Sequence, residues 1–231
     1  PSLKSLAGKV TELMPMPQRK TGASYDETIV LNAALEAAVR DLFSHTGPTG
    51  QRALDAVARR LQTEATDGKP ADVVERSMAY GQSVAAHILA WSQTDGGATV
   101  ENMGFPVSME LPKGPGLWVP TSAIRQQPLP LLPAWGKNRL FALPDSKACG
   151  LPPPPAYSEE SGSTFHKEAL EVYETTKALT DEQKLIARFW SDDPMLTPTP
   201  PGHWIAIVLQ IAERDRLTVD HTAEAVARTG I

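Results

Sequence analysis

The sequence has few of the residues that would cross-link it or carry it through a membrane. Cys149 is the only cysteine among 231 residues, which excludes an internal disulfide and a zinc site built from thiolates. A single cysteine does not settle the compartment, because cysteine-poor secreted proteins exist, and a secreted or periplasmic location is open. No apolar run approaches the roughly 20 residues that cross a bilayer, so we expect no transmembrane segment.

Basic residues are not in excess either. The 22 Lys and Arg residues face 27 Asp and Glu residues, the net charge is −5, and the two signs are mixed along the chain. Because no basic stripe is present to meet a polyphosphate, we do not expect a nucleic-acid partner. Hydrophobic residues make up 41% of the sequence, which is typical of a globular protein.

Alternation of apolar and polar residues, the pattern of half-buried strands, is scarce, so we expect no strands. Residues 1–98 instead predict three helices, with SYDE (24–27) as a capping box at the start of the first. Small residues between Ala79 and Ala86 predict close approach of the third helix to another helix. The apolar positions at helical spacing are Leu31, Leu35, Ala38 and Leu42, then Leu54, Val57, Ala58 and Leu61, then Val74, Met78, Gly81, Ala85 and Ile88.

Most of the 21 prolines fall in residues 99–162, including the LPPPP run at 151–155. Prolines at this density remove the amide donors of helices and sheets. Trp118, Trp135, Leu140 and Phe141 are too apolar for a free linker. We therefore expect a proline-rich strap packed on the helices.

Residues 163–231 return to helical spacing. TDEQ (180–183) is a second capping box, Thr218 is expected to cap a last short helix, and the apolar positions are Leu185, Ile186, Phe189 and Trp190, then Trp204, Ile205, Val208, Leu209 and Ala212. The predicted fold is all-α. It is a helical bundle formed by residues 1–98 and 163–231, with the strap of residues 99–162 across it.

The stretch PTPPGHWIAIV (198–208) allows two interpretations. In the structural one, Thr199 is the N-cap, Pro200 the first helical residue, and Gly202 allows close packing beside a neutral, hydrogen-bonded His203. In the functional one, His203 is a general base or an oxyanion ligand at the helix N-terminus. We favour the structural interpretation, because no basic or hydrogen-bonding partner lies nearby in the sequence.

Other motifs that carry chemistry are missing. The remaining histidines, His45, His87, His166 and His221, show neither the i, i+4 spacing of a helical metal site nor an HExxH motif. Asp192 and Asp193 precede Pro194, where acidic side chains commonly accept backbone amides, and as a metal site they lack further ligands. Neither a phosphate-binding glycine loop nor a GxSxG motif occurs.

Three blocks of the sequence stand out together: GQSVAAHILAWSQTDGG (81–97), residues 114–143 with W-x-P-T, P-x-W-G and F-x-L elements, and residues 179–204, which end in PPGHW. Together they resemble one family, the bacterial vanadium-dependent haloperoxidase-like proteins of the type 2 phosphatidic-acid-phosphatase superfamily. The region before Gly81 matches only in helical character. The resemblance implies two packed helical bundles, and this sequence corresponds to the first bundle, the N-terminal half, with its strap.

In that family, a Lys, an Arg, an S-G-H motif and a later Arg and His hold vanadate or a phosphate ester. The resemblance therefore implies halide oxidation by peroxide, or phosphate ester hydrolysis, in the complete protein. This chain lacks that set, and Pro201 stands where the hydroxyl residue of S-G-H would be. We expect no catalytic, cofactor-binding or metal-binding residue here, with His203 as the one weak candidate. Vanadate or phosphate is expected only in the complete protein.

The sequence starts at Pro1 without a signal peptide and stops soon after its last helix begins, so we expect a piece of a longer protein. Its expected partner is the missing catalytic half or a second polypeptide, and a homo-oligomer is also open. Two other functions are kept. One is a stand-alone helical binding or scaffold module, and the other is a hydrolase that uses His203 with Asp192 or Asp193.

Overall fold

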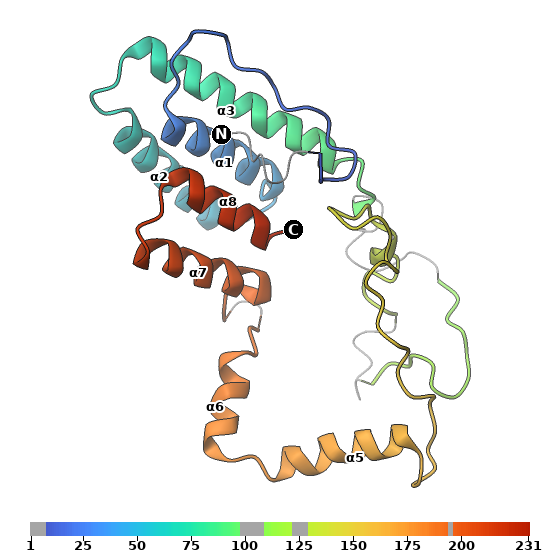
Figure 1. Ribbon diagram of the computed structural model, residues 1–231. Helices are drawn as coiled ribbons and strands as arrows, with labels where there is room; N and C mark the ends of the chain where they lie inside the picture. Colours follow the sequence, from blue (N-terminus) through green and yellow to red (C-terminus); the bar gives the residue numbers. More distant parts are fainter. Residues whose placement is uncertain (1–7, 98–108, 122–128, 194–195) are drawn as a thin grey trace. The chain divides into compact units, whose positions relative to one another are not determined.

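The computed structural model describes residues 8–97, 109–121, 129–193 and 196–231, and this part of the chain contains helices and no strand. The all-α fold is therefore as predicted. The parts of the predicted strap at 99–108 and 122–128, and Pro194, lie outside the described residues. The elements are α1 (Glu27–Leu42), α2 (Pro48–Thr66), α3 (Ala71–Ser92), the 3-10 turn η2 (Trp135–Lys137), α5 (Thr164–Lys177), α6 (Asp181–Phe189), α7 (Thr199–Arg214) and α8 (Val219–Thr229) (Figure 1).

The chain divides into two compact units. The first comprises Pro1–Ala98, Asn138–Ala142 and Leu217–Glu224, and the second comprises Thr99–Lys137, Leu143–Arg216 and Ala225–Ile231. Packing of the strap and the C-terminal helices into one bundle with the N-terminal helices stays a prediction. None of the described helices is long and apolar enough to span a membrane.

The closest helix packing in the first unit is between α1 and α3. A Cβ atom on Gly81 would lie 2.4 Å from the Val30 carbonyl oxygen and 2.8 Å from the Ala33 Cβ, so only glycine fits at this crossing. Ser77 and Ala85, one turn to either side, are buried with it. This confirms the close approach predicted from the small residues of the third helix.

The apolar stripe predicted for the first helix is partly wrong. The buried residues of α1 are Ile29, Val30 and Ala33, whereas Leu35 and Leu42 are each 54% exposed. The reason is the close approach at Gly81, which turns the face carrying Val30 and Ala33 toward α3.

Helix capping also differs from the prediction at one end. Asp26, not Ser24, caps α1, because its carboxylate accepts the amides of Thr28 and Ile29 at 3.0 and 3.2 Å. Glu27 cannot complete the predicted capping box, since its carboxylate binds Arg19. By contrast, the capping box at Thr180 is confirmed at the start of α6.

The N-terminal segment runs in extended form along α3, as the dark blue trace in Figure 1 shows. Four side chains of α3 form hydrogen bonds with backbone carbonyls of this segment. Their spacing along α3 places all four on one side of the helix. The pairs are Arg76 with Ser24 at 2.9 Å, Tyr80 with Pro17 at 3.2 Å, His87 with Met14 at 3.0 Å and Trp91 with Thr11 at 2.9 Å. Residues without a helical pattern are thus fixed by α3.

Residues 138–142, at the end of the predicted strap, lie against the C-terminal end of α3. The Arg139 side chain, only 9% exposed, donates to the Trp91 carbonyl at 2.5 Å and to the Thr94 hydroxyl at 2.7 Å. Its guanidinium lies 4.6 Å from the centre of the Trp91 ring, and the Phe141 ring lies 5.5 Å from the same ring. Arg139 therefore adds a charged donor to a carbonyl in the last turn of α3.

Candidate functional site

The site expected around His203 is a histidine–carboxylate pair between α6 and α7. The Nδ1 atom of His203 lies 2.9 and 3.0 Å from the two carboxylate oxygens of Asp192. The side chains are 15% and 6% exposed, respectively. Because an ionised carboxylate can only accept, Nδ1 donates and carries a proton. The hydrogen-bonded histidine of the structural interpretation is present.

Aromatic rings hold the imidazole in place. The ring of His203 stacks on Trp190 with 4.9 Å between centroids and 19° between planes, and it meets Phe189 edge-on at 4.9 Å and 72°. Trp204 continues the cluster at 5.8 Å from Trp190. The four rings join the end of α6 to the first turn of α7. Trp204, predicted to begin a buried stripe, is instead about half exposed at 53%.

A turn after α6 places the Asp192 carboxylate beside His203. Asp192 has a φ of +43°, in the left-handed region that Asp tolerates better than most residues. Asp193, the other carboxylate considered, is exposed. Its backbone carbonyl accepts the amides of Leu196 and Thr197 at 3.2 and 3.1 Å. Of the two aspartates, the structure pairs Asp192 with His203.

The first turn of α7 offers few amides to an anion. Pro200 and Pro201 have no N–H, and the Thr199 amide is bound by the Thr197 hydroxyl at 3.1 Å. The prediction of Thr199 as N-cap is wrong, because Thr199 is the first helical residue, with φ +66°, and Pro198 takes the capping position without a side-chain bond. Gly202 packs closely as predicted, since a Cβ there would lie 2.5 Å from the Pro198 Cβ.

Vanadate or phosphate does not fit at these residues. An anion at a helix N-terminus needs free amides, whereas Pro200 and Pro201 have none and the Thr199 amide is already bound. The Asp192 carboxylate, which is bound to the imidazole, would also repel an oxyanion. What the arrangement does is fasten α6 to α7 through one ion pair or hydrogen bond and a set of stacked rings.

The other histidines lie apart from this pair. His87 binds the Met14 carbonyl, the Nδ1 atom of His221 lies 3.2 Å from the Thr218 hydroxyl, and the Nδ1 atom of His166 is buried without a hydrogen-bond partner among the described residues. His45 is exposed in the turn after α1. Across the described ranges, no group of three or more His, Cys, Asp or Glu residues could hold a metal ion.

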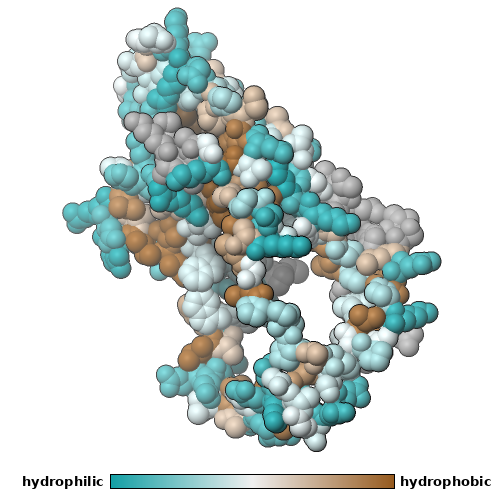
Figure 2. Space-filling view, turned by 45° about the vertical axis from the view of Figure 1, so that its right-hand side comes forward, coloured by the Kyte–Doolittle hydropathy of each residue, from teal (hydrophilic) through white to brown (hydrophobic). Residues whose placement is uncertain are grey.

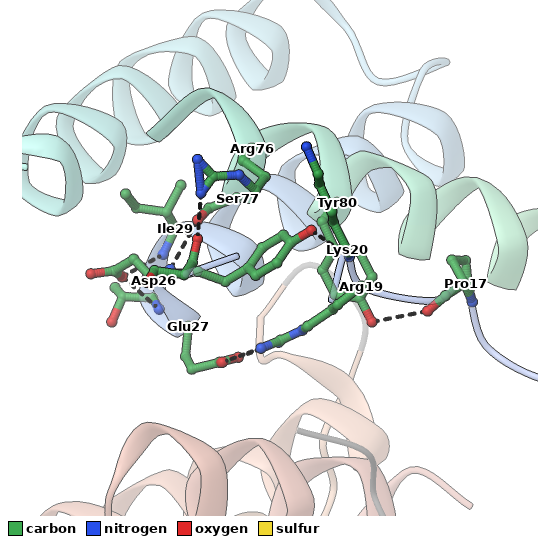
Figure 3. A network of polar contacts seen from close by, with 12 residues as sticks. Pro17, Arg19, Lys20, Asp26, Glu27, Ile29, Arg76, Ser77 and Tyr80 are labelled. Atoms are coloured by element: carbon green, nitrogen blue, oxygen red, sulfur yellow. Dashed lines mark hydrogen bonds and ion pairs between the residues drawn. The ribbon is translucent and has the colours of Figure 1, made fainter. Parts of the chain in front are cut away.

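A second polar cluster, which the sequence did not reveal, fixes the N-terminal segment (Figure 3). The Arg19 guanidinium lies beside the rings of Tyr25 and Tyr80, at 5.0 and 4.9 Å from their centroids. It also binds Glu27 through two hydrogen bonds of 2.5 and 2.6 Å. These bonds raise the pKa of Arg19 and lower the pKa of Glu27 below its usual value.

Asp26 belongs to the same cluster. Lys69 binds its carboxylate at 2.7 Å, and this bond lowers the pKa of Asp26, with help from the capped amide of Ile29. The Asp26 amide donates to the fully buried Ser77 hydroxyl at 2.9 Å. Every cation in the cluster already has an anionic or aromatic partner, which indicates a structural role.

Comparison with known proteins identifies the type of helical fold. No family model matches the chain, and no curated protein matches it. Among solved structures, a bacterial vanadium-dependent iodoperoxidase is similar, with a TM-score of 0.71 and 27% sequence identity over 97% of this chain and 54% of that chain. The chain therefore has a vanadium haloperoxidase-like helical fold, and it spans about half the length of the iodoperoxidase.

Proposed function

We propose that this chain is the N-terminal, non-catalytic helical part of a vanadium haloperoxidase-like or acid-phosphatase-like protein of the type 2 phosphatidic-acid-phosphatase superfamily. The complete protein oxidises halide with peroxide at bound vanadate, or hydrolyses a phosphate ester. The observation that carries the proposal is the likeness of 97% of this chain to only 54% of an iodoperoxidase. This chain forms a wall that supports the pocket, and the oxyanion is held by the remaining polypeptide.

The residues of this chain support the proposal that the oxyanion is bound by the remaining polypeptide. The sequence has no S-G-H motif with partner Lys and Arg residues, and His203 is engaged by Asp192. Two of the four residues in the first turn of α7 are prolines, which have no amide donor. His203 accordingly stabilises the junction of α6 and α7.

Exposed apolar side chains on the second unit favour an interface with a partner polypeptide. The described α5 and α6 have no buried residue, and large apolar side chains on α6 and at the start of α7 are about half exposed or more. The view in Figure 2 shows several hydrophobic patches among hydrophilic side chains. Exposed apolar surface of this extent normally marks an interface. The apolar residues concerned are Leu185, Ile186, Phe189, Trp190 and Trp204.

The test compares this chain alone with the same chain joined to, or co-expressed with, the polypeptide that its gene encodes after Ile231. Iodide and bromide oxidation by peroxide are measured with orthovanadate, and p-nitrophenyl phosphate hydrolysis is measured without it. We expect turnover only when the second polypeptide is present. Robust turnover of either kind by these 231 residues alone would contradict the proposal.

A stand-alone helical binding or scaffold module is the second candidate. The observation in its favour is the first unit, where Arg19, Arg139 and α3 fix the N-terminal segment without help from another chain. This candidate predicts a monomer that unfolds cooperatively and binds little of a hydrophobic dye. Strong dye binding that disappears when the second polypeptide is added would instead favour the first proposal.

A further inference from the structure

The LPPPP run at 151–155 is exposed and extended. Leu151 is 90% exposed, the next three prolines are exposed, and Pro155 is partly buried. The run lies in neither a helix nor a turn, and no backbone hydrogen bond joins residues 151–157 to another described residue. Leu151 and the three prolines after it therefore present apolar surface to solvent.

Both ends of the run are anchored. Before it, the Gly150 amide closes a turn on the Lys147 carbonyl at 3.0 Å. After it, the Tyr157 ring packs on Gly116, where a Cβ would lie 2.7 Å from the ring, and on the Phe165 ring at 5.1 Å. The Tyr157 hydroxyl donates to Glu159 at 2.5 Å. The prolines themselves restrict the backbone of the run, and Tyr157 packs at its C-terminal end, so little conformational entropy remains to be lost on binding.

The chemistry of the run selects one kind of binding surface. Each proline fixes φ near −65° and has no N–H, so consecutive prolines form a left-handed polyproline II helix whose carbonyls stay free to accept. Grooves lined with aromatic rings recognise such a helix, because flat rings fit between the proline rings. Exposed carboxylates follow at Glu159 and Glu160, and they favour a groove with basic residues at its rim.

We propose that residues 151–155 are a preformed polyproline ligand for a partner protein whose groove is lined with aromatic rings and has a basic rim. Leu151 is the apolar anchor at one end of the ligand, and the two glutamates fix its direction. This inference does not rest on the proposed function.

The test is isothermal titration of the full chain with a purified EVH1 domain, which presents an aromatic-lined groove for proline-rich segments. We expect one domain to bind per chain with a dissociation constant of about 10–100 μM. The double variant Pro153→Ala and Pro154→Ala, and separately Leu151→Ala, should weaken binding at least tenfold. Added salt should weaken it as well, because the glutamates are exposed.

Pro112→Ala is the matched control, because Pro112 is an exposed proline outside the run. It should bind the domain as the wild type does, and circular dichroism should show the same helix content for all variants. The proposal is overturned if the wild-type chain shows no binding at about 1 mM domain, the weak limit of specific recognition. It is also overturned if the double proline variant binds as tightly as the wild type.

Discussion

The imidazole of His203 is bound through Nδ1 to the carboxylate of Asp192, eleven residues earlier, at 2.9 Å. The carboxylate is almost fully buried, so this one contact satisfies a charge that would otherwise face apolar rings. His203 is the residue for which the sequence allowed a catalytic interpretation. In the structure it joins two helices.

His203→Ala should therefore lower the free energy of unfolding by about 2–4 kcal/mol, because it leaves the Asp192 carboxylate buried without its partner. Urea unfolding followed by tryptophan fluorescence measures the change. Asp193→Ala, which removes an exposed carboxylate from the same turn, is the control and should stay within about 0.5 kcal/mol of the wild type. An unchanged stability for His203→Ala would rule out the structural role.

Gly81→Ala should destabilise the first unit by about 2–4 kcal/mol, since the added methyl group collides with backbone and not with a flexible side chain. Thermal unfolding by circular dichroism reports the effect. Gly162→Ala is the matched control, because nothing lies within 4 Å of a Cβ at that position. If the two variants melted alike, α1 and α3 could not be as close as the structure shows.

Arg139→Lys should loosen the end of α3 although it keeps the charge. Lysine cannot reproduce the forked contacts to the Trp91 carbonyl and the Thr94 hydroxyl. We expect faster hydrogen exchange in residues 10–12 and 138–142 and a loss of about 1–3 kcal/mol in stability. Arg60→Lys, at an exposed position of α2, should change neither quantity. Unchanged exchange in Arg139→Lys would show that the guanidinium is dispensable.

Stability should fall on acidification, because Asp26 and Glu27 have pKa values lower in the folded chain than their ordinary values of 3.8 and 4.5. A group with a depressed folded pKa stabilises the fold above its unfolded pKa, and the contribution is lost as the pH falls through the folded pKa. The loss should thus begin near pH 4.5 and continue below pH 3.8. Urea unfolding across this range measures it.

Glu27→Gln tests the source of that acid sensitivity. It removes the ion pair with Arg19, so its stability should be lower near neutral pH and should depend less on pH in the acid range. Glu168→Gln, at an exposed position of α5, should retain the acid dependence of the wild type. An acid profile of Glu27→Gln that is superimposable on the wild-type profile would exclude the Arg19–Glu27 pair as a cause.

Local signals in the sequence predicted local structure well. The capping box at Thr180 and the glycine at 81 act through neighbours within one turn or through the absence of a side chain, and both are present as expected. The all-α fold follows from many such signals together. The cap of α1 was predicted two residues too early, because the binding of Glu27 by Arg19 is a tertiary contact that the local pattern does not contain.

Contacts between distant residues could not be predicted in this way. Tyr80 and Pro17 are 63 positions apart, and Trp91 and Thr11 are 80 apart, yet these pairs fix an N-terminal segment that shows no helical period. The pairing of His203 with Asp192 was among the alternatives considered, because both residues stand out in a short stretch. The aromatic rings around the imidazole depend on how the chain turns after α6.

The most direct test of the account is equilibrium dialysis of the isolated chain against orthovanadate, with the bound vanadium measured per chain. The account predicts no specific binding, and wild type and His203→Ala should retain equal, negligible amounts. One vanadate held per wild-type chain and lost in His203→Ala would show that these residues form an oxyanion site themselves, which would contradict the account.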